Sequence, residues 1–352
     1  MELSTQEPTH PPHPAVNEAK RPQVQPWVHL LAGATGGMVT AIITSPLDVL
    51  RTRLQSDLYA SSAHDSKSGL SSFKSPFRHV YDTFHTVGTI RGREGWHGLF
   101  RGLGPSLAGV VPATAVKFYV YGNCKQLSVQ YLGLRPDEPI VHALGAVAAG
   151  LATATVTNPI WLVKTRLQLD MAQSRHGALM RQYSGSLDCI RQVVRSEGMR
   201  GLYRGLTASY LGTAETVLHL VIYERLKAVF HTSLAKFTTT DTPALGEVAN
   251  WTSTSGAAGC AKIAAVLITY PHEVVRTRLR QAPADKGQQG YSGLLQCFRI
   301  IWHVEGWRGL YGGLTPHLVR SVPSAVITLG VYEFVLRLAK TPATEPSKQF
   351  TP

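Results

Sequence analysis

The sequence predicts an all-α membrane protein built from three similar repeats, each with two transmembrane helices packed around a polar interior. Two motifs recur three times in the same order, and six apolar stretches hold few charges. Charged residues make up only 16% of the chain, against about a quarter in a typical soluble domain. A soluble α-solenoid of three repeats does not explain why the charges gather between the apolar stretches.

The first motif follows the first apolar stretch of each repeat. Its three copies are SPLDVLRTRLQ at 45–55, NPIWLVKTRLQ at 158–168 and YPHEVVRTRLR at 270–280. Each copy contains a proline, a base five residues later and an arginine two residues after that base. The prolines, spaced by 113 and 112 residues, are Pro46, Pro159 and Pro271. An acid stands two residues after the first and third prolines, whereas the second copy has tryptophan there.

The second motif begins with Glu-Gly. It reads EGWHGLFRGLGPS from Glu94, EGMRGLYRGLTAS from Glu197 and EGWRGLYGGLTPH from Glu305. Because two independent motifs recur in the same order, we interpret the chain as a threefold repeat. The predicted organisation is a flexible tail at 1–25, repeats at 26–130, 138–232 and 246–340, a loop insertion at about 56–78 in the first repeat, and a second tail at 341–352.

The apolar stretches have the length of membrane spans. They cover 27–45, 141–158 and 252–270 before the prolines, and 103–126, 206–228 and 314–337 at the ends of the repeats. About 20 residues cross a bilayer core as a helix. Glycine, serine and threonine occur throughout, which favours helices around a polar interior over helices surrounded by lipid.

The charge balance restricts the classes of partner. The formal net charge is +13, which suits an anionic small substrate or anionic lipid. The bases are spread between apolar helices, so we expect no nucleic-acid partner. No GxxxxGK[ST], HExxH or GxSxG pattern occurs, so we expect no enzyme. The four cysteines lack CxxC or histidine pairing, so we expect no metal site.

The pattern Pro-x-acid-x-x-base-x-Arg, followed by Glu-Gly-x4-aromatic-base-Gly about every 110 residues, resembles the mitochondrial carrier family over residues 26–340. The resemblance implies six transmembrane helices in three pseudo-symmetric pairs around a central cavity, with three short helices on the matrix side. It also implies a multi-pass protein of the mitochondrial inner membrane that works by alternating access between a matrix gate and a cytoplasmic gate.

The resemblance assigns the first motif to the matrix gate. Acid and base three residues apart share a helix face, so each acid can meet the base of a neighbouring helix. Exposed pairs contribute only about 0–1 kcal/mol each, which suits a gate that must open. The expected gate residues are Asp48, Arg51, Trp161, Lys164, Glu273 and Arg276, with Gln55 and Gln168 as bracing residues and Arg280 in that position of the third repeat. The prolines of the motif are expected to kink the helices.

Trp161 removes one acid from this ring. We expect Arg276 to lose its ion-pair partner and to lie against the indole in a cation–π contact of about 0.5–2 kcal/mol. The cytoplasmic motif, aromatic-acid-x-x-base, is less complete. Its expected residues are Tyr121, Lys125, Tyr223, Glu224, Lys227, Tyr332 and Glu333. Gly122 replaces an acid and Leu336 a base, so this gate should be weak.

The family's substrate contacts lie midway along the even-numbered helices. They fall here on Gly109, Val110, Gly212, Thr213 and Arg320. The small residues leave room for a flat group, and the Arg320 guanidinium suits phosphate. Isolated ionisable residues in apolar helices add Lys117, Glu215 and Lys262 to the expected substrate-binding set.

The stretches RGLGPSLAGVVPA, NPIWLVKTRLQ, RGLTASYLGTAE, TYPHEVVRTRLRQ and KFYVYG resemble the pyrimidine nucleotide carriers of this family. The resemblance implies antiport of pyrimidine (deoxy)nucleotides such as UTP, CTP, dTTP and their diphosphates. Carriers of NAD, FAD or folate also have tryptophan in the second motif and stay open as alternatives, as does a non-transporting membrane scaffold or receptor. We expect a monomer without a cofactor, in contact with inner-membrane lipids, with cardiolipin near segments such as GLYRG.

Overall fold

The computed structural model describes residues 26–56, 76–136, 138–173, 182–237, 243–282, 291 and 293–339. The two predicted tails and most of the predicted 56–78 insertion lie outside these residues. The described residues form helices and no strand. The helices are α1 (Pro26–Gln55), α3 (Pro76–Leu99), α4 (Leu103–Leu132), α5 (Pro139–Gln173), α6 (Ser186–Gly201), α7 (Leu206–Phe237), α8 (Pro243–Arg280), α9 (Leu294–Val304), α10 (Gly306–Leu310) and α11 (Leu314–Ala339).

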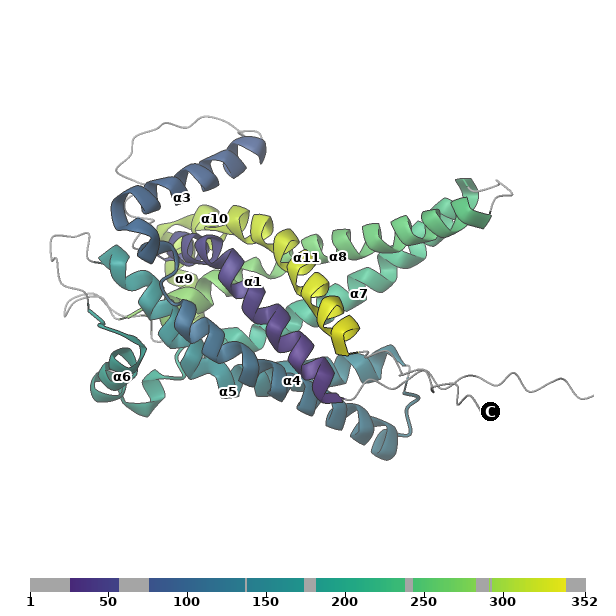
Figure 1. The fold of residues 1–352 in the computed structure, drawn as a ribbon, viewed down its shortest axis with the longest axis horizontal. Helices are drawn as coiled ribbons and strands as arrows, with labels where there is room; N and C mark the ends of the chain where they lie inside the picture. The colour runs from purple at the N-terminus through teal and green to yellow at the C-terminus, as the bar shows by residue number, and fades with distance from the viewer. Residues whose placement is uncertain are drawn as a thin grey trace, which may run out of the picture.

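Six long helices form a ring. In chain order these are α1, α4, α5, α7, α8 and α11, and α11 returns to pack along α1. Closely packed pairs are α4 with α5, α7 with α8, and α11 with α1. The helices α3, α6, α9 and α10 lie at one end of the ring, on the left in Figure 1, which we call the short-helix end. Towards the other end, the open end, the α7–α8 hairpin diverges from the remaining helices (Figure 1).

Within the described residues, four segments are long and apolar enough to span a membrane. They are Trp27–Gln55, Glu94–Leu132, Pro139–Asp170 and Gly306–Leu338. The two other ring helices have the length but are more polar: α7 has 32 residues and α8 has 38. Glu215 on α7 and Lys262 on α8 contribute to this polarity, which is expected where helices line a polar interior.

The ring helices continue through the prolines of the first motif. Pro46 lies inside α1, Pro159 inside α5 and Pro271 inside α8. A proline cannot donate to the carbonyl four residues earlier, so that acceptor needs another partner. In the third repeat the hydroxyl of Tyr311 donates to the carbonyl of Leu267, at 3.0 Å. A side chain between α10 and α11 thus satisfies the acceptor that Pro271 frees.

A small apolar core lies at the base of each repeat. Leu50 of α1 packs against Ile90 and Leu99 of α3. In the second repeat Leu162 and Val163 of α5 pack against α6, and in the third α8 packs against α9 and α10. These three cores fix the short helices to the ends of α1, α5 and α8.

A buried ion pair accompanies each core. The arginine seven residues after each motif proline meets the glutamate of the second motif, in the pairs Arg53–Glu94 (2.7 Å), Arg166–Glu197 (2.5 Å) and Arg278–Glu305. All three arginines are almost fully buried. Breaking such a pair leaves a buried charge alone, which costs about 3–5 kcal/mol. Each pair therefore links the first and second motifs of its repeat in the folded structure.

Candidate substrate cavity and closing ring

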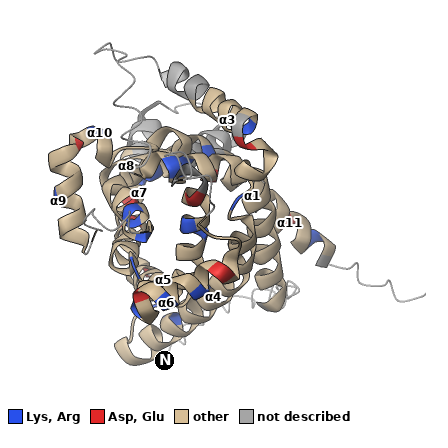
Figure 2. Cartoon of the chain, turned by 90° about the vertical axis from the view of Figure 1, so that its left-hand side faces the viewer, with Lys and Arg blue, Asp and Glu red and all other residues tan. Residues whose placement is uncertain are grey.

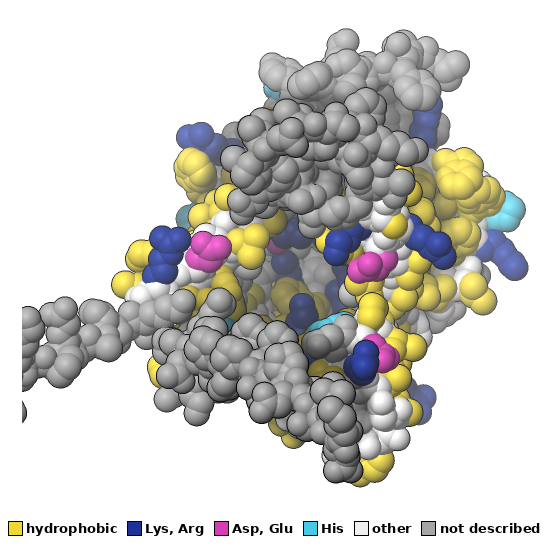
Figure 3. All heavy atoms as spheres, turned by 90° about the vertical axis from the view of Figure 1, so that its right-hand side faces the viewer, with side chains coloured by type: hydrophobic (Ala, Val, Ile, Leu, Met, Phe, Trp, Pro, Cys, Tyr) yellow, Lys and Arg dark blue, Asp and Glu magenta, His cyan; other side chains and the backbone are white. Residues whose placement is uncertain are grey.

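A cavity of about 660 Å³ lies inside the ring and is lined by residues of all six long helices. This volume lies in the usual range for small-molecule sites. Figure 3 looks into the hollow from the open end and shows lysine and arginine side chains inside it. Viewed from the short-helix end, the helices of the ring carry residues of both charge signs (Figure 2). The lining includes six bases and two acids, Asp48 and Glu273.

Three ion pairs join the long helices at the short-helix end. Asp48 of α1 pairs with Lys164 of α5 at 3.1 Å, and Glu273 of α8 pairs with Arg51 of α1. Arg320 of α11 also approaches Asp48, with 3.1 Å between its Nε and the carboxylate. These side chains are 12–24% exposed. The predicted matrix-gate charges thus come together from helices far apart in the sequence and close this end of the cavity.

The predicted contact between Trp161 and Arg276 is wrong. Arg276 instead pairs with Glu273, three residues earlier on its own helix, where the two side chains lie on one face. The indole of Trp161 lies 5.3 Å from the ammonium of Lys164, and its Nε1 donates to the Thr157 hydroxyl at 2.8 Å. Glu273 therefore serves two arginines, and no ion pair among the described residues joins α5 to α8 at this level.

The residues in the bracing position each lie against the glycine that immediately precedes the previous long helix of the ring, α4, α7 or α11. Gln168, Arg280 and Gln55 contact Gly102, Gly205 and Gly313, whose φ angles are 82°, 75° and 75°. A Cβ at any of these glycines would lie 2.9–3.3 Å from the bracing side chain. Only glycine tolerates both this backbone conformation and this close approach.

The three bracing residues differ in their hydrogen bonds. Gln55 donates to the Tyr270 hydroxyl at 3.0 Å and accepts from Thr277 at 2.8 Å. Gln168 accepts from Thr52 at 2.8 Å. Arg280 donates to the Asn158 amide oxygen at 2.8 Å and to the Ser209 hydroxyl at 2.9 Å. The third repeat thus places a cation where the other two have a neutral amide.

Among the predicted substrate contacts, Val110, Lys117 and Arg320 line the cavity. The expectation that Gly109 and Gly212 leave room for cargo is wrong, because protein side chains occupy that room. A Cβ at Gly109 would lie 3.1 Å from Ile160 and 3.5 Å from the Trp161 ring, and one at Gly212 would lie 3.2 Å from His272.

The space inside the ring comes from α5 instead. Along the middle of α5 the lining residues are small and recur every three or four positions, which places them on one helix face. They are Ala146, Ala149, Gly150, Thr153, Ala154 and Thr157. Thr213 does not line the cavity; its methyl group packs on Gly150, as Val110 packs on Gly37. Small residues on α5 were not part of the predicted site, although their spacing is visible in the sequence.

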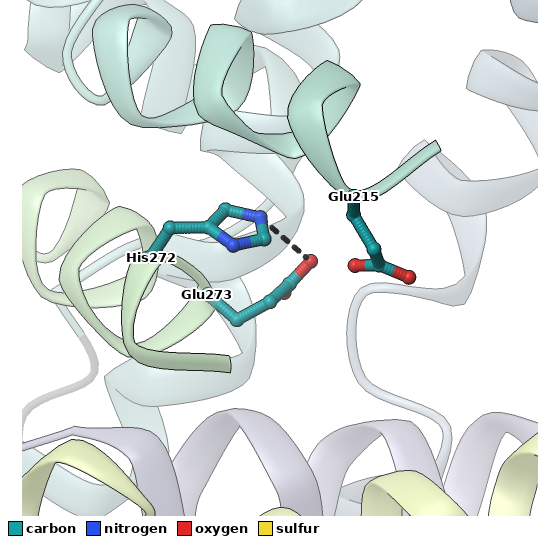
Figure 4. A group of neighbouring side chains, drawn as sticks. All are labelled: Glu215, His272 and Glu273. Carbon is teal, nitrogen blue, oxygen red and sulfur yellow. Dashed lines mark ion pairs between the residues drawn. The ribbon is translucent and has the colours of Figure 1, made fainter. Parts of the chain in front are cut away.

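Lys262 and Glu215 neutralise each other. The Lys262 ammonium lies 2.6 Å from the Glu215 carboxylate, and neither residue is part of the cavity lining. Glu215, His272 and Glu273 place one ligand atom each within 4.8 Å of the others. Figure 4 shows these three side chains converging. This geometry could hold a cation. Lys262, Arg51 and Arg276 already pair with its two carboxylates, so we interpret the group as an ion-pair network.

At the open end, the predicted cytoplasmic-gate residues form no ion pair between helices within the described residues. Glu333 lies 3.8 Å from Arg337 on its own helix, and Lys227 lies 5.9 Å from the Tyr223 ring. The two other tyrosines hydrogen-bond to histidines that the sequence analysis missed, in the pairs Tyr332–His29 (2.7 Å) and Tyr121–His142 (2.6 Å). Both histidines stand 17 residues before a motif proline, so aligning the repeats could have identified them.

A ring of membrane-length helices, a basic cavity and ion pairs across one end define a membrane transport protein of the carrier type. The family model for mitochondrial carrier proteins matches residues 22–132, 135–234 and 247–342. The chain belongs to the mitochondrial carrier family. It is a multi-pass protein of the mitochondrial inner membrane and a carrier rather than an enzyme.

Three relatives from fungi and vertebrates match almost the whole chain. The mitochondrial pyrimidine nucleotide transporter RIM2 of Saccharomyces cerevisiae is 44% identical over 331 residues, which cover 90% of this chain and 87% of the relative. Mitochondrial carrier protein rim2 of Schizosaccharomyces pombe is 44% identical, with 92% of both chains covered. Solute carrier family 25 member 36 of Gallus gallus is 42% identical, with 88% of this chain and 97% of the relative covered.

Proposed function

We propose that the chain exchanges pyrimidine (deoxy)nucleotides, namely UTP, CTP, dTTP and their diphosphates, across the mitochondrial inner membrane. The observation that carries the proposal is the 44% identity, over 90% of this chain, to a pyrimidine nucleotide transporter. The cavity supports it with four more bases than acids. A chain of phosphates supplies the complementary charge, and arginine forks bind phosphate oxygens in pairs.

The shape of the cavity fits the two parts of a nucleotide. The small face of α5, around Ala146 and Thr153, leaves space for a flat base. Lys117 and Arg320 stand on α4 and α11, where they can bind phosphates from separate sides. Cargo enters from the open end, because ion pairs close the short-helix end, which by resemblance faces the matrix.

Alternating access follows from the strengths of the contacts. The Asp48–Lys164 and Glu273–Arg51 pairs must break to release cargo on the other side, and the tyrosines at the open end must then approach each other. Partly exposed pairs are weak enough for this, and differential contacts with the cargo can shift such an equilibrium. Monomeric action and binding of cardiolipin at the short helices belong to this proposal as well.

The experiment is uptake by reconstituted carrier in liposomes preloaded with unlabelled UTP. Labelled UTP, CTP, dTTP, ATP, NAD and FAD are supplied outside, with protein-free liposomes as the control. We expect uptake of the three pyrimidine nucleotides. Uptake of NAD or FAD without pyrimidine uptake would favour the alternative cargo, and no uptake of any of these compounds by folded protein would favour a scaffold.

A further inference from the structure

Where the third repeat lines the short-helix end of the cavity, it carries more arginines than acids. Arg276 and Arg280 stand one turn apart on α8, and both line the cavity. The Arg280 residue is only 7% exposed. Its two hydrogen bonds go to neutral groups of Asn158 and Ser209, and its Nε has no hydrogen-bond partner. In the part of the chain that the structure describes, no carboxylate lies within ion-pair distance of this guanidinium.

This arrangement is unfavourable unless an anion is present. A buried charge without a counter-ion is costly, and like charges one turn apart on a helix repel each other. Arg276 shares the carboxylate of Glu273 with Arg51. In the first and third repeats an acid stands two residues after the motif proline. On α5 this position holds Trp161, whose indole lies beside Lys164. The protein itself therefore leaves this sector with excess positive charge.

We propose that Arg276 and Arg280 form a subsite for the terminal phosphate of the cargo, and that this phosphate supplies the anion absent at Trp161. The proposal rests on the nucleotide exchange proposed above and names the part of the cavity that recognises phosphate number. Two guanidinium groups one turn apart can bind the non-bridging oxygens of one phosphate. With the base against α5, we place the terminal phosphate of a nucleoside di- or triphosphate on these two arginines.

The test compares KM for UMP, UDP and UTP in exchange assays of four variants. In Trp161→Glu, the new carboxylate takes the place of the phosphate, and Arg280→Gln restores the amide of the other two repeats. For the wild type we expect KM to fall at least about tenfold from UMP to UTP. Both variants should lose most of this ratio, mainly through a higher KM for UTP.

Trp161→Phe and Arg308→Gln are the matched controls, the first adding no charge and the second removing an exposed arginine of α10. Both should keep the ratio.

The outcomes separate this proposal from the proposed function. If the wild type exchanges UTP while Trp161→Glu and Arg280→Gln keep the wild-type ratio, the subsite is wrong and nucleotide exchange stands. If the wild type exchanges no pyrimidine nucleotide, the proposed function fails and a second measurement decides on the subsite. Inorganic tripolyphosphate should then raise the melting temperature of the purified wild type and not that of Arg280→Gln. Equal stabilisation of both, or of neither, would overturn the subsite.

Discussion

The carboxylate of Asp48 on α1 lies 3.1 Å from the ammonium of Lys164 on α5, across the short-helix end of the ring. Both side chains are more than four-fifths buried. Contacting charges of this kind couple by roughly 0.5–3 kcal/mol in double-mutant cycles. We expect the double variant Asp48→Asn/Lys164→Gln to be destabilised by less than the sum of the two single variants, measured by unfolding of the purified protein in detergent.

The control for this cycle pairs Asp48→Asn with Arg308→Gln, which changes an exposed residue of α10. Effects at distant, independent sites add. Additive effects in the Asp48–Lys164 cycle itself would show that the contact does not hold the end of the ring closed.

The Arg53–Glu94 pair should be needed for stability rather than for cargo recognition. Arg53 is fully buried, and its two Nη atoms donate to the two carboxylate oxygens at 2.8 and 2.7 Å. Glu94→Gln should lower the free energy of unfolding by about 3–5 kcal/mol. Glu333→Gln is the matched control, because its exposed pair with Arg337 at 3.8 Å contributes only about 0–1 kcal/mol. A similar loss in both variants would contradict the structural role of the buried pair.

Gly205 lies inside the second motif, immediately before α7, in a conformation that other residues adopt at a cost. Its φ is 75°, and a Cβ would lie 3.1 Å from Cγ of Arg280. Gly205→Ala should destabilise the protein by at least about 1–2 kcal/mol, the cost of left-handed backbone. Gly330→Ala, inside α11 with open space around it, should be neutral or stabilising by up to about 1 kcal/mol. Thermal unfolding of the two variants would distinguish them, and equal melting temperatures would contradict the account.

Cys189 reports whether α6 is docked on α5. Burial against Leu162 and Val193 raises the pKa of its thiol to about 11. The thiolate is the reactive form, so alkylation should be slow at pH 8 and should accelerate up to about pH 11. The measurement uses a variant with the other three cysteines replaced by alanine, and denaturant restores the ordinary pKa near 8.5 as the control. Rapid labelling of the folded protein at pH 8 would show that α6 is not docked.

The sequence predicted the fold and the helices that form the ring, because periodic motifs define repeats without any knowledge of packing. It also predicted that Asp48, Lys164, Arg51 and Glu273 come together, since acid and base at fixed spacing share a helix face in every copy. It could not predict the partner of Arg276. A long arginine side chain reaches several acids, and the choice depends on the rotation of α8.

The glycines of the predicted contact sites were misjudged for a related reason. Whether Gly109 opens to the cavity or receives a neighbouring side chain depends on how α4 is rotated against α5, and residue types alone do not define that angle. The cation at Arg280 was visible in the sequence as a departure from Gln55 and Gln168. Its consequence became clear only when the structure showed its two neutral partners and its place in the cavity lining.

Efflux from preloaded liposomes measures nucleotide exchange by the carrier itself. Reconstituted carrier is loaded with labelled UTP, and unlabelled UTP, CTP, NAD or buffer is added outside. We expect external UTP or CTP to accelerate loss of label well above the buffer control, and NAD to have no effect. Acceleration by NAD alone, or efflux that no external nucleotide changes, would contradict pyrimidine nucleotide exchange.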